Sequence, residues 1–271
     1  MITFSKLGRL GAMGNQLFQY AALFGLADKN GYKMVIPITP NDIKGELKVT
    51  GHTKDGHPIE KYDYCLSYFS ITAEMVDRHS LVDSKIYKQN SGLKKIYKKS
   101  HSQIISQYLE PHFHFDQGFF NIQDSTNIEG YFQSEKYFSH CSDKIRREFS
   151  IKKEYQDEAR EKLSIYKKDS DVLISAHIRR LGHENPETQN IHKYPTADYY
   201  QNALNYFKIR YDNPKMLVFS DDMKWCKQNI VGNEIDYSEE NSSIIDFTMM
   251  SLCNHNIITP SSFSWWASWL N

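Results

Sequence analysis

A histidine and two adjacent arginines follow an apolar run in the second half of the chain. The run "DVLI" continues as "SAHIRR", so that His177, Arg179 and Arg180 stand at the end of a predicted strand. Side chains alternate along a strand, which places His177 and Arg179 on one face while Arg180 begins the loop. Because arginines are costly to desolvate without an anion, the pair predicts a counter-charge, which is either a phosphate or a buried carboxylate of the protein.

Two other predicted strand ends favour the phosphate. "FSDD" places Ser220 and Asp221 after an apolar run, although an aspartate there could equally cap the next helix. "TPSSFSWW" places Ser261 and Ser262 where a strand meets a helix N-terminus, and hydroxyls and backbone N–H groups can bind an anion there. Arginine, helix dipole and serine could therefore converge on one phosphate site.

A single carboxylate, Asp246, interrupts an apolar helical segment, "IIDFTMM". It could accept two N–H bonds from a guanine edge, or it could be an ordinary charge near a helix N-terminus. Near the start of the chain, "GRLGAMGNQLF" is a glycine-containing turn in which Gly14, Asn15 and Gln16 would let backbone and amide groups approach a sugar or a phosphate. Since the turn lacks both the GxGxxG spacing and the lysine of a P-loop, a dinucleotide dehydrogenase is disfavoured.

No grouping in the sequence predicts a metal site. His112 and His114 are two residues apart, but nothing else completes a ligand set, so surface or otherwise satisfied histidines are expected. The four cysteines are scattered without a CxxC pair, which is typical of a reducing compartment. We therefore expect a cytoplasmic protein without a structural metal.

Charge and hydropathy exclude two further classes of protein. Lysine plus arginine equals aspartate plus glutamate at 33 each, which argues against a nucleic-acid partner held by general electrostatic attraction. No apolar stretch reaches the roughly 18 residues of a membrane span, and no apolar segment follows the basic residues at the start. Neither a span nor a signal peptide is expected, while a peripheral association with the inner membrane surface stays open.

The candidate site residues are positioned by strands and helices that alternate along the chain. A strand over 2–7, a helix ended by Gly31 and a strand over 32–38 predict one βαβ unit. Residues 41–110 are polar and predict irregular structure, with the lysine-rich run 94–100 as a solvated helix face. A strand in "NIEGYF" and an amphipathic helix opened by Ser134 and Glu135 follow.

From Asp171 onward, short apolar runs alternate with helical segments up to "SSFSWWASWLN". This alternation predicts a parallel, doubly wound sheet, which binds ligands at the carboxyl ends of its strands where the strand order reverses. A chain of 271 residues is long for one such domain, so two lobes with a cleft are expected.

Five blocks together carry a family resemblance: "GNQLFQYA", "IEGYFQSEKYF", "HIRR", "FSDD" and "SSFSWWASWL". In this order they resemble the inverting alpha-1,2-fucosyltransferases of glycosyltransferase family 11, of bacterial or viral type. The resemblance implies an α/β, GT-B-like fold with two Rossmann-like lobes whose parallel sheets face a cleft. Residues 1–150 would form the acceptor-side lobe and 151–271 the nucleotide-sugar-binding lobe.

The same resemblance implies the partners and the roles of the site residues. The donor would be GDP-fucose, the acceptor a galactose-terminated oligosaccharide, and no metal would be needed. Arg179 would bind the β-phosphate and assist catalysis, and the turn of Gly14, Asn15 and Gln16 would face the fucose. The remaining donor-binding residues would be His177 and Asp246 along the guanosine, with Arg180, Ser220, Asp221, Ser261 and Ser262.

The chain departs from the family pattern at one place in particular. The family pattern is HxRRxD, whereas the arginines here are followed by Leu181, Gly182 and His183, so the aspartate is absent unless Glu184 takes its role. His183 and Glu184 are candidate catalytic bases, as is Asp198. The chain also ends within the predicted last helix, so a short final element is expected. Another sugar-nucleotide donor, or an inactive glycan- or nucleotide-binding relative, stay as alternatives.

Overall fold

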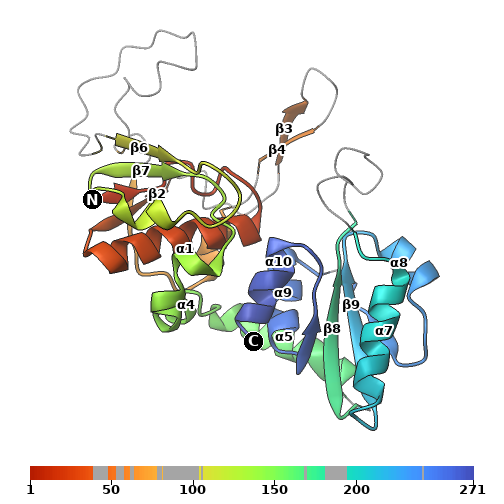
Figure 1. The fold of residues 1–271 in the computed structure, drawn as a ribbon. Coiled ribbons are helices and arrows are strands. Elements are labelled where there is room, and N and C mark those ends of the chain that lie inside the picture. The colour runs from red at the N-terminus through yellow and green to blue at the C-terminus, as the bar shows by residue number, and fades with distance from the viewer. Residues whose placement is uncertain are drawn as a thin grey trace. The chain divides into compact units, whose positions relative to one another are not determined.

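A computed structural model shows two units, Met1–Ser150 and Ile151–Asn271, in Figure 1. The described residues are 1–38, 48–52, 58–61, 64–77, 81, 104, 106–167, 170–180, 194–239 and 241–271. The roles expected for the two lobes, and the cleft between them, stay predictions.

A parallel sheet of five strands forms the centre of unit 1. Its order is β5 (Glu74–Asp77), β2 (Met34–Ile38), β1 (Ile2–Thr3), β7 (Thr126–Glu129) and β6 (Ser106–Leu109). The predicted strands over 32–38 and in "NIEGYF" are confirmed as β2 and β7. A separate antiparallel pair is formed by β3 (Lys48–His52) and β4 (Pro58–Lys61).

The expected strand over 2–7 is wrong beyond Thr3. The Leu7 amide donates to the Phe4 carbonyl at 3.0 Å, which starts a series of turns in place of a strand. Gly8 and Gly11, farther along these turns, have φ of 78° and 84°, a left-handed conformation that favours glycine. The central strand is therefore short, and the turns after it carry the chain to the next helix.

Helix α1 (Met13–Asn30) confirms the predicted helix and its end. Gly31 lies in the left-handed region and donates its N–H to Ala27 O. The amphipathic helix expected from Ser134 is wrong in its start. Ser134 does accept a bond from the Lys136 N–H, but it closes only a 3-10 turn, Glu135–Tyr137, and the α-helix begins later. A second 3-10 turn, Ser139–Cys141, precedes α4 (Ser142–Glu148).

The region 41–110 is described only in part, and the lysine-rich run 94–100 lies outside the described residues. Its described elements are β3 to β6 and the 3-10 turn Cys65–Tyr68. A further 3-10 turn, Gln117–Asn121, follows β6.

Unit 2 confirms the predicted parallel, doubly wound sheet. Its strands are β8 (Val172–Ile178), β9 (Pro214–Ser220), β10 (Ile235–Tyr237) and β11 (His255–Ile257), in the order β10, β9, β8, β11. All neighbours are parallel, and β8 is buried throughout its length. The chain moves outward from β8 to β10 and then returns to β11, so the strand order reverses between β8 and β11.

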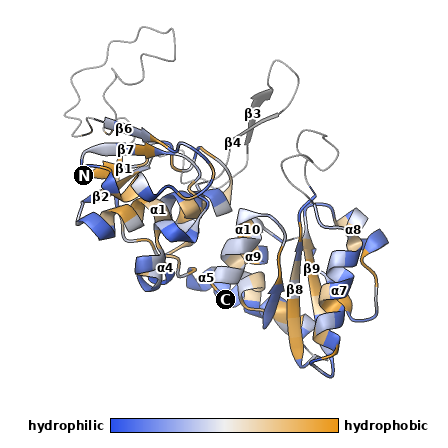
Figure 2. Cartoon of the chain, viewed as in Figure 1, coloured by the Kyte–Doolittle hydropathy of each residue, from blue (hydrophilic) through white to orange (hydrophobic). Residues whose placement is uncertain are grey.

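Helices cover both faces of this sheet (Figure 1). One face carries α7 (Ala197–Lys208) and α8 (Met223–Asn229), and the other carries α5 (Lys153–Tyr166), α9 (Ser243–Ser251) and α10 (Ser262–Trp269). Apolar residues run along β8 and β9 (Figure 2), as expected for central strands buried on both faces. Alternate residues of β8, including Ile174 and Ile178, pack with Tyr200 and Leu204 of α7 in one apolar cluster.

None of the helices in the described part of the chain combines the length and the apolar character that a membrane crossing requires.

Candidate functional site

The carboxyl edge of the unit 2 sheet brings most of the predicted donor-site residues together. Parallel strands all end at the same edge, and Arg179 follows β8 while Asp221 follows β9. Ser261 and Ser262 stand between β11 and α10. Because β8 and β11 are the neighbours between which the strand order reverses, these residues lie where sheets of this kind bind ligands.

Arg179 is held by a carboxylate at this edge. Its Nη1 lies 2.8 Å from Asp221 Oδ2, and Asp221 Oδ1 accepts the backbone N–H of Arg180 at 2.7 Å. The sequence left a phosphate and a protein carboxylate open as the counter-charge of the arginines, and the structure shows the carboxylate of Asp221 beside Arg179. The guanidinium has five N–H donors and its side chain is 42% exposed, so the ion pair orients Arg179 and leaves room for a second anion.

Arg180 packs into the fold on the opposite side of the strand. Its guanidinium lies 3.8 Å from the centre of the Trp225 ring in α8, and its Nε lies 3.4 Å from Asp222 Oδ2. Asp222 also caps α8, because it accepts the Trp225 N–H at 3.0 Å. These contacts give Arg180 a structural role, and its predicted contact with the donor stays a prediction.

His177 is a neutral imidazole in the buried part of the site. Its ring lies 5.4 Å from that of Phe263 in α10, and burial lowers its pKa to about 4. Nδ1 is buried and has no hydrogen-bond partner among the residues that the structure describes. A buried imidazole nitrogen without a partner is uncommon in proteins, and a bound ligand is one way to supply that partner.

The N-terminus of α10 is suited to an anion. Ser261 is the N-cap residue, yet its side chain makes no capping hydrogen bond, and the first turn of α10 has no acidic residue. The partial positive charge of the helix end is therefore not balanced by a carboxylate in that turn. Ser264, deeper in the helix, donates to Thr259 O and helps to fix the turn.

Asp246 lies in the first turn of α9, near the carboxyl end of β10. It accepts bonds from Ser238 Oγ at 2.8 Å and Asn241 Nδ2 at 3.1 Å, and burial raises its pKa. Strand β10 is two strand spacings from β8, about 10 Å. That separation is comparable with the length of a nucleoside, which is compatible with the predicted guanosine contact.

Ser220 joins the ends of two strands. Its hydroxyl donates to Ile178 O at 2.7 Å and accepts the Asp222 N–H at 3.0 Å. This bonding positions the segment that contains Asp221, so Ser220 supports the site from within the protein. Direct contact between Ser220 and a donor stays a prediction.

The predicted N-terminal turn lies in unit 1. Gln16 is fully buried, and its amide donates to Gly11 O and accepts the Cys65 N–H, so this side chain shapes the turn. Gly14 is buried at the start of α1. Asn15 is half-buried, and its Oδ1 accepts from Gln133 Nε2 at 2.6 Å. Of the three predicted residues, Asn15 is the one with a partly exposed side chain, and its contact with fucose stays a prediction.

Two of the catalytic candidates lie outside the described residues. His183 and Glu184 belong to the stretch 181–193, as does the position where the family pattern has its aspartate. Asp198 is exposed in the first turn of α7, where a carboxylate stabilises the helix dipole. The identity of the general base stays a prediction.

A group with metal-ligand side chains lies in unit 1. Asp28, His140 and Cys141 place one ligand atom each within 4.8 Å of one another. Each already has a partner within the protein, because Asp28 pairs with Lys144, His140 Nε2 bonds Gly25 O, and Cys141 Sγ donates to Phe138 O. Burial also raises the pKa of the Cys141 thiol to about 11, so we assign no metal to this group.

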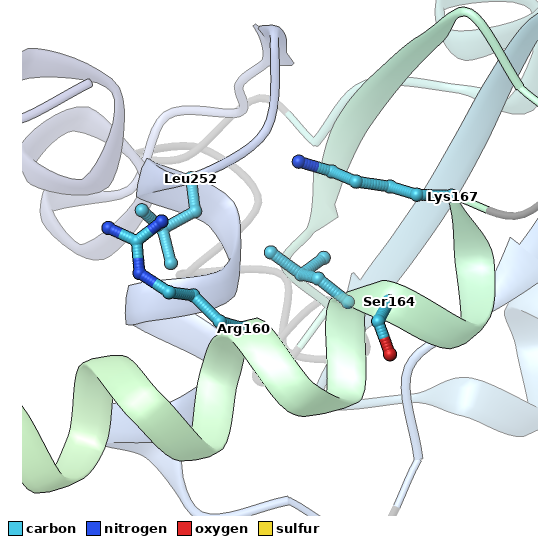
Figure 3. A pocket seen from close by; sticks show the side chains of 5 residues that line it. Arg160, Ser164, Lys167 and Leu252 are labelled. Atoms are coloured by element: carbon cyan, nitrogen blue, oxygen red, sulfur yellow. The ribbon is translucent and has the colours of Figure 1, made fainter.

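A pocket on unit 2 lies at the other end of the sheet (Figure 3). It is lined by Arg160, Leu163, Ser164, Lys167 and Leu252. Lys167 precedes β8 and Leu252 precedes β11, so the pocket adjoins the amino ends of these strands. It is therefore not part of the candidate site.

Comparison with known proteins identifies the family. Residues 58–271 match the model of glycosyl transferase family 11. An alpha-1,2-colitosyltransferase from Escherichia coli is 28% identical, with 96% of this chain and 85% of that protein aligned. Galactoside alpha-(1,2)-fucosyltransferase 2 from Pongo pygmaeus is 26% identical over 97% of this chain and 68% of its own length.

Solved structures with a similar fold are fucosyltransferases. A structure of POFUT1 in complex with GDP-fucose aligns with a TM-score of 0.54 at 10% identity, covering 99% of this chain and 93% of that chain. The fucosyltransferase NodZ from Bradyrhizobium aligns with a TM-score of 0.51 at 12% identity, covering 98% and 92%. These likenesses confirm the expected α/β, GT-B-like fold. The family match over residues 58–271 shows that the chain belongs to glycosyl transferase family 11.

Proposed function

We propose that the protein transfers L-fucose from GDP-fucose to the 2-hydroxyl of a terminal galactose. The observation that carries this proposal is Arg179, oriented by Asp221 at the carboxyl edge of the unit 2 sheet. The N-terminus of α10 follows the neighbouring strand, β11, at the same edge. A permanent cation and a helix end without acidic residues suit a diphosphate.

The choice of donor and acceptor rests on the relatives. Galactoside alpha-(1,2)-fucosyltransferases are among the similar proteins, and the similar POFUT1 structure contains GDP-fucose. Partly exposed Arg179 would bind the β-phosphate. His177 and Asp246 would lie along the guanosine, and Asn15 of unit 1 would face the fucose.

The proposed reaction is a direct displacement with inversion. The acceptor 2-hydroxyl oxygen attacks the anomeric carbon of fucose, and the bond from that carbon to the β-phosphate oxygen breaks. GDP leaves with the bonding electron pair, and Arg179 stabilises the charge that develops on it. The hydroxyl proton passes to a general base, for which His183, Glu184 and Asp198 are candidates.

The test is an incubation of the protein with GDP-fucose and lactose or N-acetyllactosamine. We expect release of GDP and a product whose NMR spectrum shows fucose linked to O2 of galactose. Absence of product with both acceptors, at protein concentrations that bind GDP, would contradict the proposal. Release of GDP that depends on the acceptor would also exclude an inactive binding protein.

A second candidate is transfer of a different sugar from a nucleotide. The similarity to an alpha-1,2-colitosyltransferase favours this alternative specifically. Thermal-shift titrations with GDP, GMP and UDP would first establish the base, and a preference for UDP would remove the argument from Asp246. Competition between GDP-fucose and GDP-colitose would then rank the two donor sugars.

A further inference from the structure

Two neighbouring aromatic side chains, one exposed and one partly exposed, lie near the carboxyl edge of the unit 1 sheet. Phe113 follows β6 and is 79% exposed, and its ring centre lies 6.3 Å from that of Tyr131, which follows β7. We call these two residues the aromatic platform. Strands β6 and β7 are parallel neighbours, so both residues follow strand ends at the same edge.

The loop that carries Phe113 is anchored at both ends. At its start, the Glu110 carboxylate accepts the N–H groups of Tyr131 and Phe132, at 2.6 and 3.0 Å. At its end, Asp116 accepts the Tyr108 hydroxyl at 2.6 Å and donates its own N–H to the Tyr137 hydroxyl at 2.9 Å. The backbone that carries the exposed ring is therefore anchored on both sides of Phe113.

Two histidines strengthen the same loop. The rings of His112 and His114 stack at 3.6 Å with an angle of 3° between their planes, and His112 Nδ1 is 2.9 Å from His114 O. Both are exposed, which confirms the expectation of surface histidines. Their stack lies within the loop on either side of Phe113 in sequence, and it limits the conformations that the loop can adopt.

The platform is continuous with the predicted fucose-facing turn. Tyr131 belongs to the platform, and Gln133, two residues later, donates to Asn15 Oδ1 at 2.6 Å. Phe132 between them is fully buried and has a φ of 51°, a left-handed conformation that is costly for a phenylalanine. Glu110 fixes this conformation through the Phe132 N–H, so a strained, bonded segment joins the platform to Asn15.

We propose that Phe113 and Tyr131 bind the acceptor sugar by stacking on the ring of its terminal galactose. This inference rests on the proposed function and adds a binding surface to it. In galactose the axial 4-hydroxyl leaves the C–H groups of carbons 3, 4 and 5 together on one face, and that face matches a flat aromatic surface. Two rings suit one or two sugar units, whereas a stable protein interface needs about 1,000 Å² or more.

The test compares Phe113→Ala with the wild-type protein in steady-state transfer. We expect the acceptor KM to rise about tenfold, with the donor KM, the GDP affinity and the melting temperature unchanged. Phe113→Trp should restore most of the acceptor affinity, because the flat surface is kept. Saturation-transfer NMR with lactose should show weaker transfer to the galactose protons in Phe113→Ala.

The matched control is Ile209→Ala. Ile209 is 83% exposed at the end of α7 in unit 2, so its truncation removes a similarly exposed apolar side chain and should leave the acceptor KM unchanged. If Phe113→Ala transfers with the wild-type acceptor KM while the wild-type protein is active, the platform assignment is wrong and the proposed function stands. If the wild-type protein transfers to no galactoside, the proposed function fails. A loss of self-association in Phe113→Ala without a change in acceptor KM would assign the platform to contacts between copies of the chain.

Discussion

The carboxyl edges of the two sheets differ in the chemistry of their side chains. The edge in unit 2 carries ionised groups that bond one another, with Arg179 on Asp221 and Arg180 beside Asp222. The edge in unit 1 also has carboxylates, such as Glu110, but it adds an amide pair, Asn15 with Gln133, and the aromatic platform of Phe113 and Tyr131. Both sheets are parallel, so the fold alone does not select the ligand. The difference teaches that one edge is suited to an anion and the other to a neutral polyol.

The largest effect is expected from substitutions at the carboxyl edge of the unit 2 sheet. Arg179→Ala should lower kcat/KM by about 10²- to 10³-fold and weaken GDP binding, because a charge-stabilising donor is removed from the leaving group. Arg179→Lys should also be impaired, since lysine offers a point charge in place of a planar fork. Steady-state kinetics and calorimetric titration with GDP measure both. Normal transfer together with normal GDP affinity would contradict the assignment.

The buried imidazole gives the next effect, on stability. The folded pKa of His177, about 4, lies below the ordinary value of 6.5 because burial disfavours the charged form. Between these values the unfolded chain binds the proton, so His177 should cost stability progressively as pH falls from 6.5 to 4. The full effect is about 3 kcal/mol. Urea unfolding of wild-type and His177→Leu proteins across this range measures it, and the difference between the two curves isolates His177. If the free energies of unfolding of the two proteins change with pH in parallel, burial of His177 does not lower stability at acidic pH.

Substitutions of two neighbouring aspartates distinguish the orientation of Arg179 from the stability of the fold. Asp221→Ala should lower transfer by about tenfold with little change in melting temperature, because Arg179 loses its partner. Asp222→Ala is the matched variant, and it should cost about 1 kcal/mol of stability through the lost cap of α8 while transfer by the folded protein is largely kept. The reverse pattern would mean that Asp222 orients the site.

The smallest effect is expected at the carboxyl edge of the unit 1 sheet. Gln133→Ala removes the bond to Asn15, so kcat should fall about threefold while the GDP affinity stays the same. Gln133 is exposed, so the free energy of unfolding should change by less than about 0.5 kcal/mol. Gln133→Glu should not restore kcat, because an ionised carboxylate cannot donate a hydrogen bond to Asn15 Oδ1. A change in GDP affinity in either variant would show that this edge also serves the nucleotide.

Much of unit 2 follows from its sequence because its signals are local. Each strand is a short apolar run, and each connection has helical spacing, so the order of elements could be predicted without knowing any contact. The positions of Arg179 and Asp221 at strand ends were predictable for the same reason. Their ion pair was not, because it depends on β8 and β9 being neighbours with Ile178 opposite Ser220.

The contacts that sequence reasoning missed are long-range. Arg180 stacks on Trp225 of α8, and nothing in the spacing of the two residues indicates it. The paired "RR" and "DD" at successive strand ends were the available signal, since opposite charges at neighbouring ends can bond. In unit 1 the early end of the first strand at Thr3 had no such signal, because Gly8 and Gly11 lie beyond the predicted strand end at Leu7. No signal in the sequence indicated that Phe113 is exposed, because its exposure depends on how both ends of its loop are held.

The pairing of β1 with β7 has a consequence for synthesis of the protein. β1 is the middle strand of its sheet, and Thr3 pairs with Asn127, which the ribosome adds 124 residues later (127 minus 3). At about 5–20 residues per second, that interval is about 6–25 s. During this time β1 can pair with β2, but its other edge waits for β7, so a nascent chain exposes an unpaired strand edge that chaperones are suited to cover.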